Sequence, residues 1–177
     1  KRARTSISLA MIRLQAQTEG PNMIDTKVTY SREVWGDLRD ELEPMFKAHW
    51  EEIEVNREKV KLSPNWASYS AIEASGCLGV YTARKEGKMI GYCVVIADTS
   101  LHHSDHIFAF NDLLYIDPAH RKGMTGMKLI KYAESDLKEC GVSYLVINTK
   151  VSHPFDPLLE RLGFDLIERS YSKYLGD

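Results

Sequence analysis

A strand, a turn and a helix follow one another between residues 107 and 141, and this succession constrains the fold more than any other part of the sequence. The strand pattern of residues 107–116 stops at Asp117-Pro118, because proline cannot donate a hydrogen bond to a neighbouring strand. After a basic turn that contains glycine, apolar residues recur at helical spacing up to Gly141: Met127, Ile130, Ala133, Leu137 and Cys140. The continuous apolar run at 144–148 is typical of a strand buried on both faces. This segment indicates an α/β protein.

The rest of the chain from residue 24 extends the same mixture of strands and helices. Pro44 interrupts an apolar helical stripe that follows Ser31, its expected cap, so we expect a kink or two consecutive helices near Leu42. Glu86-Gly87 is a hairpin signal. Beside the central segment, the sequence predicts strands at 27–30, 78–84, 89–97, 164–169 and 171–175, and helices at 34–53, 66–74 and 157–162. We expect a mixed, mostly antiparallel sheet with helices on both faces.

Length and charge restrict the classes of partner. The 177 residues fit one domain, and the net charge of −2 argues against nucleic acid as the main partner. No stretch approaches the roughly 20 apolar residues that span a bilayer, so we expect no membrane segment. Residues 1–22 hold most of the basic excess and are interpreted as an extension, either a tag or an arm, with residues 23–177 forming the domain.

Cysteine and histidine usage indicates a reducing compartment and no metal. Cys77, Cys93 and Cys140 are odd in number and widely spaced, which favours buried thiols in a cytoplasmic protein over disulfides or a zinc site. His102, His103 and His106 lie close together, but the sequence offers no matching ligand group elsewhere. We expect this cluster to line a cleft before the fourth strand.

The segment from Leu114 to Gly126 has the features of an anion site. A turn at a helix N-terminus gathers unpaired backbone N–H groups and the positive end of the helix dipole, which suits a pyrophosphate. Glycine allows close approach of the backbone, and Arg121 and Lys122 add positive charge. The alternative is a plain strand–turn–helix connection with two surface cations. The phosphate-binding patterns GxxxxGK[ST] and GxGxxG are both absent.

The element order and this turn resemble the GNAT N-acetyltransferase superfamily, in particular its compact bacterial and phage members. Arg121 and Gly126 match the ends of the family's Arg/Gln-x-x-Gly-x-Gly/Ala signature, whereas Met124 stands where the middle glycine is usual and Gly123 lies one place earlier. Leu162-Gly163-Phe164 is similar to the family's Leu-Gly-Phe turn. The resemblance extends from about residue 24 to residue 175.

The resemblance implies acetyl-CoA as co-substrate, no metal, and central strands four and five that splay apart. The pantetheine arm would pair with the backbone of Leu114, Tyr115 and Ile116, and a backbone N–H near Leu114 or Ile116 would polarise the thioester carbonyl. Ser152 occupies the position of a family asparagine and joins the expected cofactor-binding set. The remaining members of that set form the turn: Arg121, Lys122, Gly123, Met124, Thr125 and Gly126.

The expected catalytic residues depart from the family's pattern. The family often places a tyrosine, the acid that protonates the thiolate, at the position that here is Leu159, so Tyr171, Tyr174 and His153 become the acid candidates. Asp112 is the expected base, since strand alternation puts it on the same side as Leu114 and Ile116, and its apolar surroundings would raise its pKa. The alternative for Asp112 is an ion-paired or solvated acid.

Further polar residues have competing interpretations. His103 or Tyr171 would take the proton-transfer role if Asp112 does not. His49, on the apolar stripe, is expected to be a core or cleft-lining histidine. Glu51, Glu52 and Glu54 form either a solvated helix end or an acidic patch that attracts a cationic amine.

Three hypotheses of function follow. The leading one is an N-acetyltransferase whose acceptor, a primary amine of a small molecule or protein, attacks acetyl-CoA directly in a ternary complex. The second is a catalytically silent CoA-binding or protein-interaction module with the same fold. The third is an unrelated α/β protein. A homodimer is compatible with each.

Overall fold

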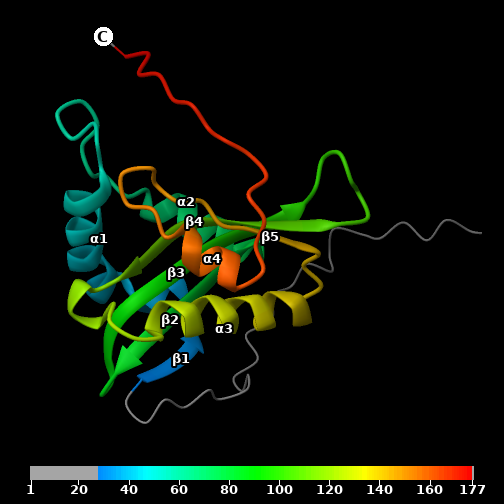
Figure 1. Cartoon of the computed structure of the whole chain (residues 1–177), viewed down its shortest axis with the longest axis horizontal. Coiled ribbons are helices and arrows are strands. Elements are labelled where there is room, and N and C mark those ends of the chain that lie inside the picture. Colours follow the sequence, from blue (N-terminus) through cyan, green and yellow to red (C-terminus); the bar gives the residue numbers. More distant parts are fainter. Residues whose placement is uncertain (1–27, 177) are drawn as a thin grey trace, which may run out of the picture.

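The computed structural model describes residues 28–176 and shows one five-stranded sheet in the order β1-β2-β3-β4-β5 (Figure 1). All neighbouring strands are antiparallel except β4 and β5, which are parallel. The mixed, mostly antiparallel α/β sheet predicted from the sequence is therefore confirmed. Residues 1–22, interpreted as an extension, and Lys27 lie outside the described residues. The strands are β1 Val28–Arg32, β2 Leu78–Lys85, β3 Lys88–Thr99, β4 Ile107–Ile116 and β5 Tyr144–Val146.

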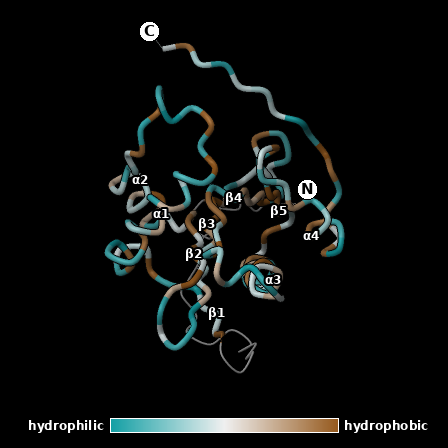
Figure 2. The backbone as a smooth tube through the Cα atoms, turned by 60° about the vertical axis from the view of Figure 1, so that its left-hand side comes forward, coloured by the Kyte–Doolittle hydropathy of each residue, from teal (hydrophilic) through white to brown (hydrophobic). Residues whose placement is uncertain are grey.

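Helices cover both faces of this sheet. Figure 2 shows α1 and α2 on one side and α3 and α4 on the other. The α1–α2 side buries Trp35, Leu42, Phe46 and Tyr92, and the α3 side buries Tyr30, Tyr81, Leu129 and Tyr132 among other residues. The helices are α1 Arg39–Ile53, α2 Trp66–Ala74, α3 Thr125–Glu139 and α4 Asp156–Arg161, with 3₁₀ turns η2 Trp35–Asp37 and η3 Pro118–His120.

The turn signals read from the sequence are largely confirmed. Glu86 and Gly87 both adopt positive φ, of 51° and 81°, as a two-residue hairpin turn requires. Gly76 and Gly141 follow α2 and α3 with φ of 78° and 86°, which is the usual conformation after a helix C-terminus. The side chain of Asn65 caps α2 by accepting a hydrogen bond from the backbone N–H of Ser68.

The start of α1 differs from the prediction. Ser31 belongs to β1, and its hydroxyl donates to Glu33 instead of capping a helix. The break between helical segments lies at Leu38, between η2 and α1, and not near Leu42. Pro44 lies in the second turn of α1 without ending the helix, and its ring removes one backbone donor from the helix.

The two C-terminal strands predicted at 164–169 and 171–175 are absent from the described residues. Gly163, with φ of 87°, ends α4, and residues 164–176 then run as an extended tail (red in Figure 1). Apolar alternation suggested strands, but a strand forms only where it finds a hydrogen-bonding partner edge. Here the alternating side chains remain exposed, with Leu166 at 75% and Tyr171 at 93% of their full exposure.

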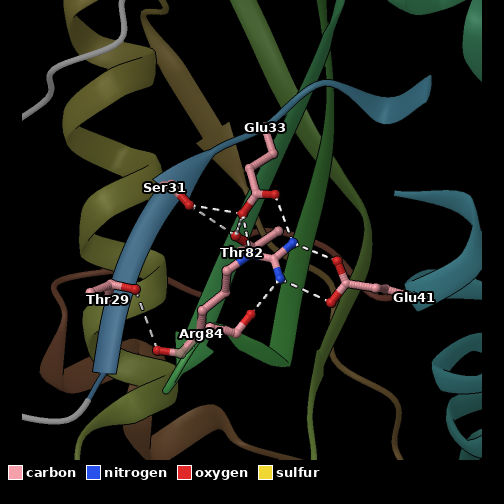
Figure 3. A network of polar contacts seen from close by, with 7 residues as sticks. Thr29, Ser31, Glu33, Glu41, Thr82 and Arg84 are labelled. Atoms are coloured by element: carbon pink, nitrogen blue, oxygen red, sulfur yellow. Dashed lines mark hydrogen bonds and ion pairs between the residues drawn. The ribbon is translucent and has the colours of Figure 1, made fainter. Parts of the chain in front are cut away.

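A polar network fixes the beginning of α1 against the sheet (Figure 3). The Arg84 guanidinium on β2 donates to both carboxylate oxygens of Glu33, at 2.7 and 2.8 Å, and to both of Glu41 on α1, at 2.9 and 2.8 Å. Thr82 and Ser31 donate to Glu33 as well. The network sets the orientation of α1, whose last turns reach the site described below.

Candidate functional site

The strands β4 and β5 diverge, as the splayed pair in the predicted fold requires. They pair only from Phe108 to Phe110, opposite Tyr144 to Val146. At the divergence the buried side chain of Asn111 accepts a hydrogen bond of 2.5 Å from the backbone N–H of Asn148. Among the described strands, β4 residues beyond this point pair only with β3. The second half of β4 therefore offers a backbone edge to a ligand.

A β-bulge at Asp112 changes which way the β4 side chains point. Leu113 pairs with Val94 and Asn111 with Val95, so Asp112 is the extra residue. Leu114 and Ile116 consequently pack on the α3 side, while Tyr115 packs on the α1–α2 side. Asp112 faces α2, and the prediction that it shares a side with Leu114 and Ile116 is wrong.

The partner of Asp112 is Tyr69 of α2, whose hydroxyl donates a short hydrogen bond to Oδ2. Burial first, and then the hydrogen bond to Asp112, raise the pKa of Tyr69. The Tyr69 ring stacks on Trp35 with centroids 4.2 Å apart. Sequence reasoning missed this residue, because an aromatic residue at helical spacing indicates only core packing. Tyr69 thus holds the carboxylate that was predicted as the base.

The turn between β4 and α3 has the predicted form. Asp117 accepts a hydrogen bond of 2.8 Å from the Ala119 N–H, and η3 then leads into Gly123, whose φ is 104°. Met124, the N-cap of α3, offers no side-chain hydrogen bond to the first amides of the helix. A Cβ added at Gly126 would lie 3.7 Å from Ile116, so a small side chain would fit. The glycine that the backbone requires is Gly123.

Arg121, expected to add positive charge to this turn, is already paired. Its Nη1 and Nη2 donate to both carboxylate oxygens of Glu52 on α1 at 2.6 Å each, and its Nε donates to the Ile116 carbonyl at 2.8 Å. The hydrogen bond from Arg121 holds the pKa of Glu52 below its ordinary value, despite partial burial. The sequence suggested that Glu52 is either a solvated acid or part of an acidic patch that attracts a cationic amine. Neither interpretation anticipated that it pairs with Arg121, 69 positions away.

His49, one turn before Glu52, lines the same region. Its Nδ1 lies 2.8 Å from the Tyr92 hydroxyl, and its ring stacks on Tyr115 at 4.8 Å between centroids. Burial lowers the pKa of His49 to about 4, so the ring is neutral at pH 7. The expected core or cleft-lining role is confirmed.

The loop between β5 and α4 lies opposite the end of α1. The charges of Lys150 and His153 act on His49 and Glu52 respectively, which brings this loop near the turn. His153 Nδ1 lies 3.1 Å from Ser152 Oγ, and the His153 N–H donates to the Lys150 carbonyl at 2.9 Å. Of the three acid candidates, His153 is the one whose charge acts on Glu52.

The other predicted residues lie elsewhere. His103 stacks on Phe108, at the opposite end of β4 from Ile116 and roughly 13 Å along the strand from Asp112. Tyr171 lies on the exposed tail, and Tyr174 contacts Lys59, at 5.2 Å from the ring centroid. Leu159 is buried, so the family's tyrosine position is filled by packing. Lys122 is an exposed residue of the turn.

Within residues 28–176 no group of histidine, cysteine and acidic side chains is arranged to hold a metal. The three cysteines are free. No helix of the described part is both long and apolar enough to cross a membrane. A surface groove lies away from β4, on the outer face of α1, and is lined by Asp40, Glu43, Pro44, Lys47, Leu62 and Pro64.

Comparison with known proteins gives consistent results. Residues 35–164 match the family described as Acetyltransferase (GNAT) family. An aminoglycoside acetyltransferase from an uncultured soil metagenomic sample superposes with a TM-score of 0.66 at 17% identity, covering 87% of this chain and 98% of its own. Ribosomal-protein-alanine N-acetyltransferase from Brucella melitensis gives 0.64 at 18% identity, and glucosamine-6-phosphate N-acetyltransferase from Arabidopsis thaliana gives 0.64 at 14%, each covering 84% of this chain and 99% of its own. A search of curated proteins finds no match.

Proposed function

Since the chain belongs to the GNAT acetyltransferase family, we propose that it transfers the acetyl group of acetyl-CoA to an amine. One observation carries the proposal: the edge of β4 that β5 leaves free ends at the turn that opens α3. An extended amide-bearing arm and a pyrophosphate, joined in one ligand, match this succession of a strand edge and an amide-rich turn.

The residues present fit acetyl-CoA. Backbone groups of Leu114, Tyr115 and Ile116 would pair with the pantetheine arm, as a neighbouring strand would. The N–H groups between residues 121 and 126 would bind the pyrophosphate, with Lys122 adding charge. Gly123, in its left-handed conformation, keeps the backbone of the turn accessible. Because Glu52 occupies the Arg121 guanidinium, we assign phosphate binding to the backbone of the turn.

Two polar side chains, Asp112 and His153, would move the protons. Bound acetyl-CoA supplies a thioester carbonyl, and a β4 N–H beyond the bulge would stabilise the negative charge that develops on its oxygen. Asp112, whose carboxylate accepts a hydrogen bond from the Tyr69 hydroxyl, would take a proton from the acceptor amine through a water. His153 would return a proton to the departing thiolate.

The acceptor is proposed as a primary amine on a small molecule or a protein. The names of the structural neighbours refer to aminoglycosides, glucosamine-6-phosphate and a ribosomal protein alanine, which all carry such a group. The amine would enter from the α1–α2 side, where Asp112 and Tyr69 meet. A carboxylate there also attracts the ammonium form of an amine.

Calorimetric titration with acetyl-CoA tests the proposal. Gly126→Leu and Arg121→Glu place bulk and negative charge in the turn, and both should abolish binding while circular dichroism stays unchanged. Gly36→Leu is the matched control, since a Cβ at Gly36 meets no atom within 4 Å and lies in η2. Wild-type affinity in both turn variants would remove the turn from the site.

A second candidate function is favoured by the buried Leu159, which leaves the family's tyrosine position without an acid. In that case the chain binds acetyl-CoA as a silent module. Measuring CoA release against pools of amines, peptides and aminoglycosides separates the two functions. Binding without release above the rate of buffer hydrolysis would favour the module.

A further inference from the structure

We infer that Glu52 is a positioning residue, which fixes the turn between β4 and α3 for acetyl-CoA by holding Arg121 against α1. This inference rests on the proposed function, because it assigns a role within the same binding site. It concerns a residue of α1, a helix that contributes nothing to the signature of the turn. Glu52 itself would not contact the reacting atoms.

All three guanidinium nitrogens of Arg121 have a partner. Nε donates to the Ile116 carbonyl and thereby closes the segment from the end of β4 to the turn, while both terminal nitrogens donate to Glu52. The guanidinium carbon also lies 5.4 Å from the centroid of the Tyr115 ring. A bidentate pair fixes the plane of the guanidinium as well as its distance. Arg121 is thus tied to β4 and to α1 at once.

The last turns of α1 hold the two parts of the site together. His49 stacks on Tyr115 of the free β4 edge, and Glu52, three residues later on the same helix face, holds the first residue of the turn. The opposite end of α1 is tied to β2 by the Arg84–Glu41 pair. α1 therefore fixes the position of the β4 edge, which would bind the pantetheine arm, relative to the turn, which would bind the pyrophosphate.

Electrostatic attraction alone predicts that removing the charge of Glu52 strengthens acetyl-CoA binding, whereas a positioning role predicts that it weakens binding. A carboxylate near a bound pyrophosphate repels it, and a guanidinium released from Glu52 would attract it. If electrostatic attraction dominated, Glu52→Gln would bind acetyl-CoA more tightly than wild type. If positioning dominates, as we infer, the same substitution weakens binding, because the turn must then be ordered at the moment of binding.

The size of the effect follows from the exposure of the pair. The Arg121 and Glu52 side chains are 40% and 24% exposed, so the pair belongs near the upper end of the range for surface ion pairs. We expect Glu52→Gln to raise the dissociation constant of acetyl-CoA about 5-fold. The Michaelis constant for acetyl-CoA should rise by the same factor while kcat stays within about twofold. The reason is that the substitution disorders the turn that binds acetyl-CoA and removes no group that takes part in the reaction.

Glu51→Gln is the matched control. It removes the same charge from the same helix one residue away, where Glu51 pairs only loosely with Lys47, at 4.0 Å. Acetyl-CoA affinity should be unchanged in this variant. Hydrogen exchange of the free proteins gives a readout without ligand: amides of residues 119–124 should exchange about 5-fold faster in Glu52→Gln than in Glu51→Gln.

The outcomes are distinct. Weaker binding and faster exchange in Glu52→Gln alone support the positioning role. Tighter or unchanged binding, equal losses in the two variants, or an exchange pattern that does not change at the turn would overturn it. If wild-type protein fails to bind acetyl-CoA, the proposed function falls, whereas the exchange comparison still decides whether Glu52 orders the turn.

Discussion

Replacing Arg84 by methionine tests the network that anchors α1. Methionine keeps an apolar stem of similar length and removes every hydrogen bond that Arg84 donates to Glu33 and Glu41. Glu33 then remains largely buried, with only the Thr82 and Ser31 hydroxyls to satisfy its charge. The substitution therefore leaves a carboxylate without its cation.

The loss of unfolding free energy in Arg84→Met lies between the values for a fully buried and a fully exposed ion pair. Removing one partner of a fully buried pair costs about 3–5 kcal/mol, and removing an exposed pair costs about 0.2–1 kcal/mol. The Arg84 and Glu33 side chains are 18% and 21% exposed, and Glu41 is 42% exposed, so we expect a loss of about 2–3 kcal/mol in the free energy of unfolding. For a domain of this size that loss lowers Tm by about 5–10 °C.

The loss depends on pH with a defined sign. Burial alone would raise the pKa of Glu33, but the hydrogen bonds from Arg84, Thr82 and Ser31 outweigh it and hold the pKa below 4.5. The hydrogen bond from Arg84 likewise lowers the pKa of Glu41. Groups with a lowered folded-state pKa stabilise the protein above about pH 4.5, and this stabilisation is lost as the pH falls through their folded-state values. The difference between wild type and Arg84→Met should therefore shrink from pH 7 to pH 3.

Urea and thermal unfolding at several pH values measure this difference. Lys47→Met is the control, because Lys47 and Glu51 are 72% and 54% exposed and 4.0 Å apart, and we expect a change under about 0.5 kcal/mol. If Arg84→Met matches the control, or if its deficit is as large at pH 3 as at pH 7, the reasoning about this network is refuted.

Two further predictions concern the site and the extension. Asp112→Asn should lower kcat about 10²–10⁴-fold and leave the affinity for acetyl-CoA within about twofold, whereas Tyr69→Phe, which removes only the hydrogen bond to Asp112, should lower kcat by less. Full turnover in Asp112→Asn together with loss in His103→Ala or Tyr171→Phe would transfer the role to one of those residues. Deleting the extension up to Pro21 should leave calorimetric affinity for acetyl-CoA unchanged, and a large loss would show that it folds into the domain or into a neighbouring subunit.

The elements that local sequence determines were predicted closely. The hairpin at Glu86-Gly87 and the bounds of β4 follow from turn residues and apolar patterns that act within a few positions. The turn before α3 was predicted for the same reason. The tail was not, since the apolar alternation around Leu166 and Tyr171 cannot reveal whether a partner edge is available.

The contacts that define the site lie beyond the reach of such patterns. The bulge that turns Asp112 toward α2 depends on the pairing of β4 with β3, and strict alternation could not reveal it. Tyr69 and Asp112 are 43 positions apart, and Glu52 and Arg121 are 69 apart. With one sequence, only the folded backbone shows that these pairs meet.

A crystal structure of the chain grown with CoA shows whether the β4 edge and the turn before α3 form the acetyl-CoA site. We expect pyrophosphate oxygens at about 2.7–3.2 Å from backbone nitrogens of residues 121–126, with the pantetheine arm along β4 residues 111–116. We also expect Arg121 to remain paired with Glu52 in the complex. CoA bound elsewhere, for example in the groove between Lys47 and Leu62 on the outer face of α1, would contradict this assignment of the site.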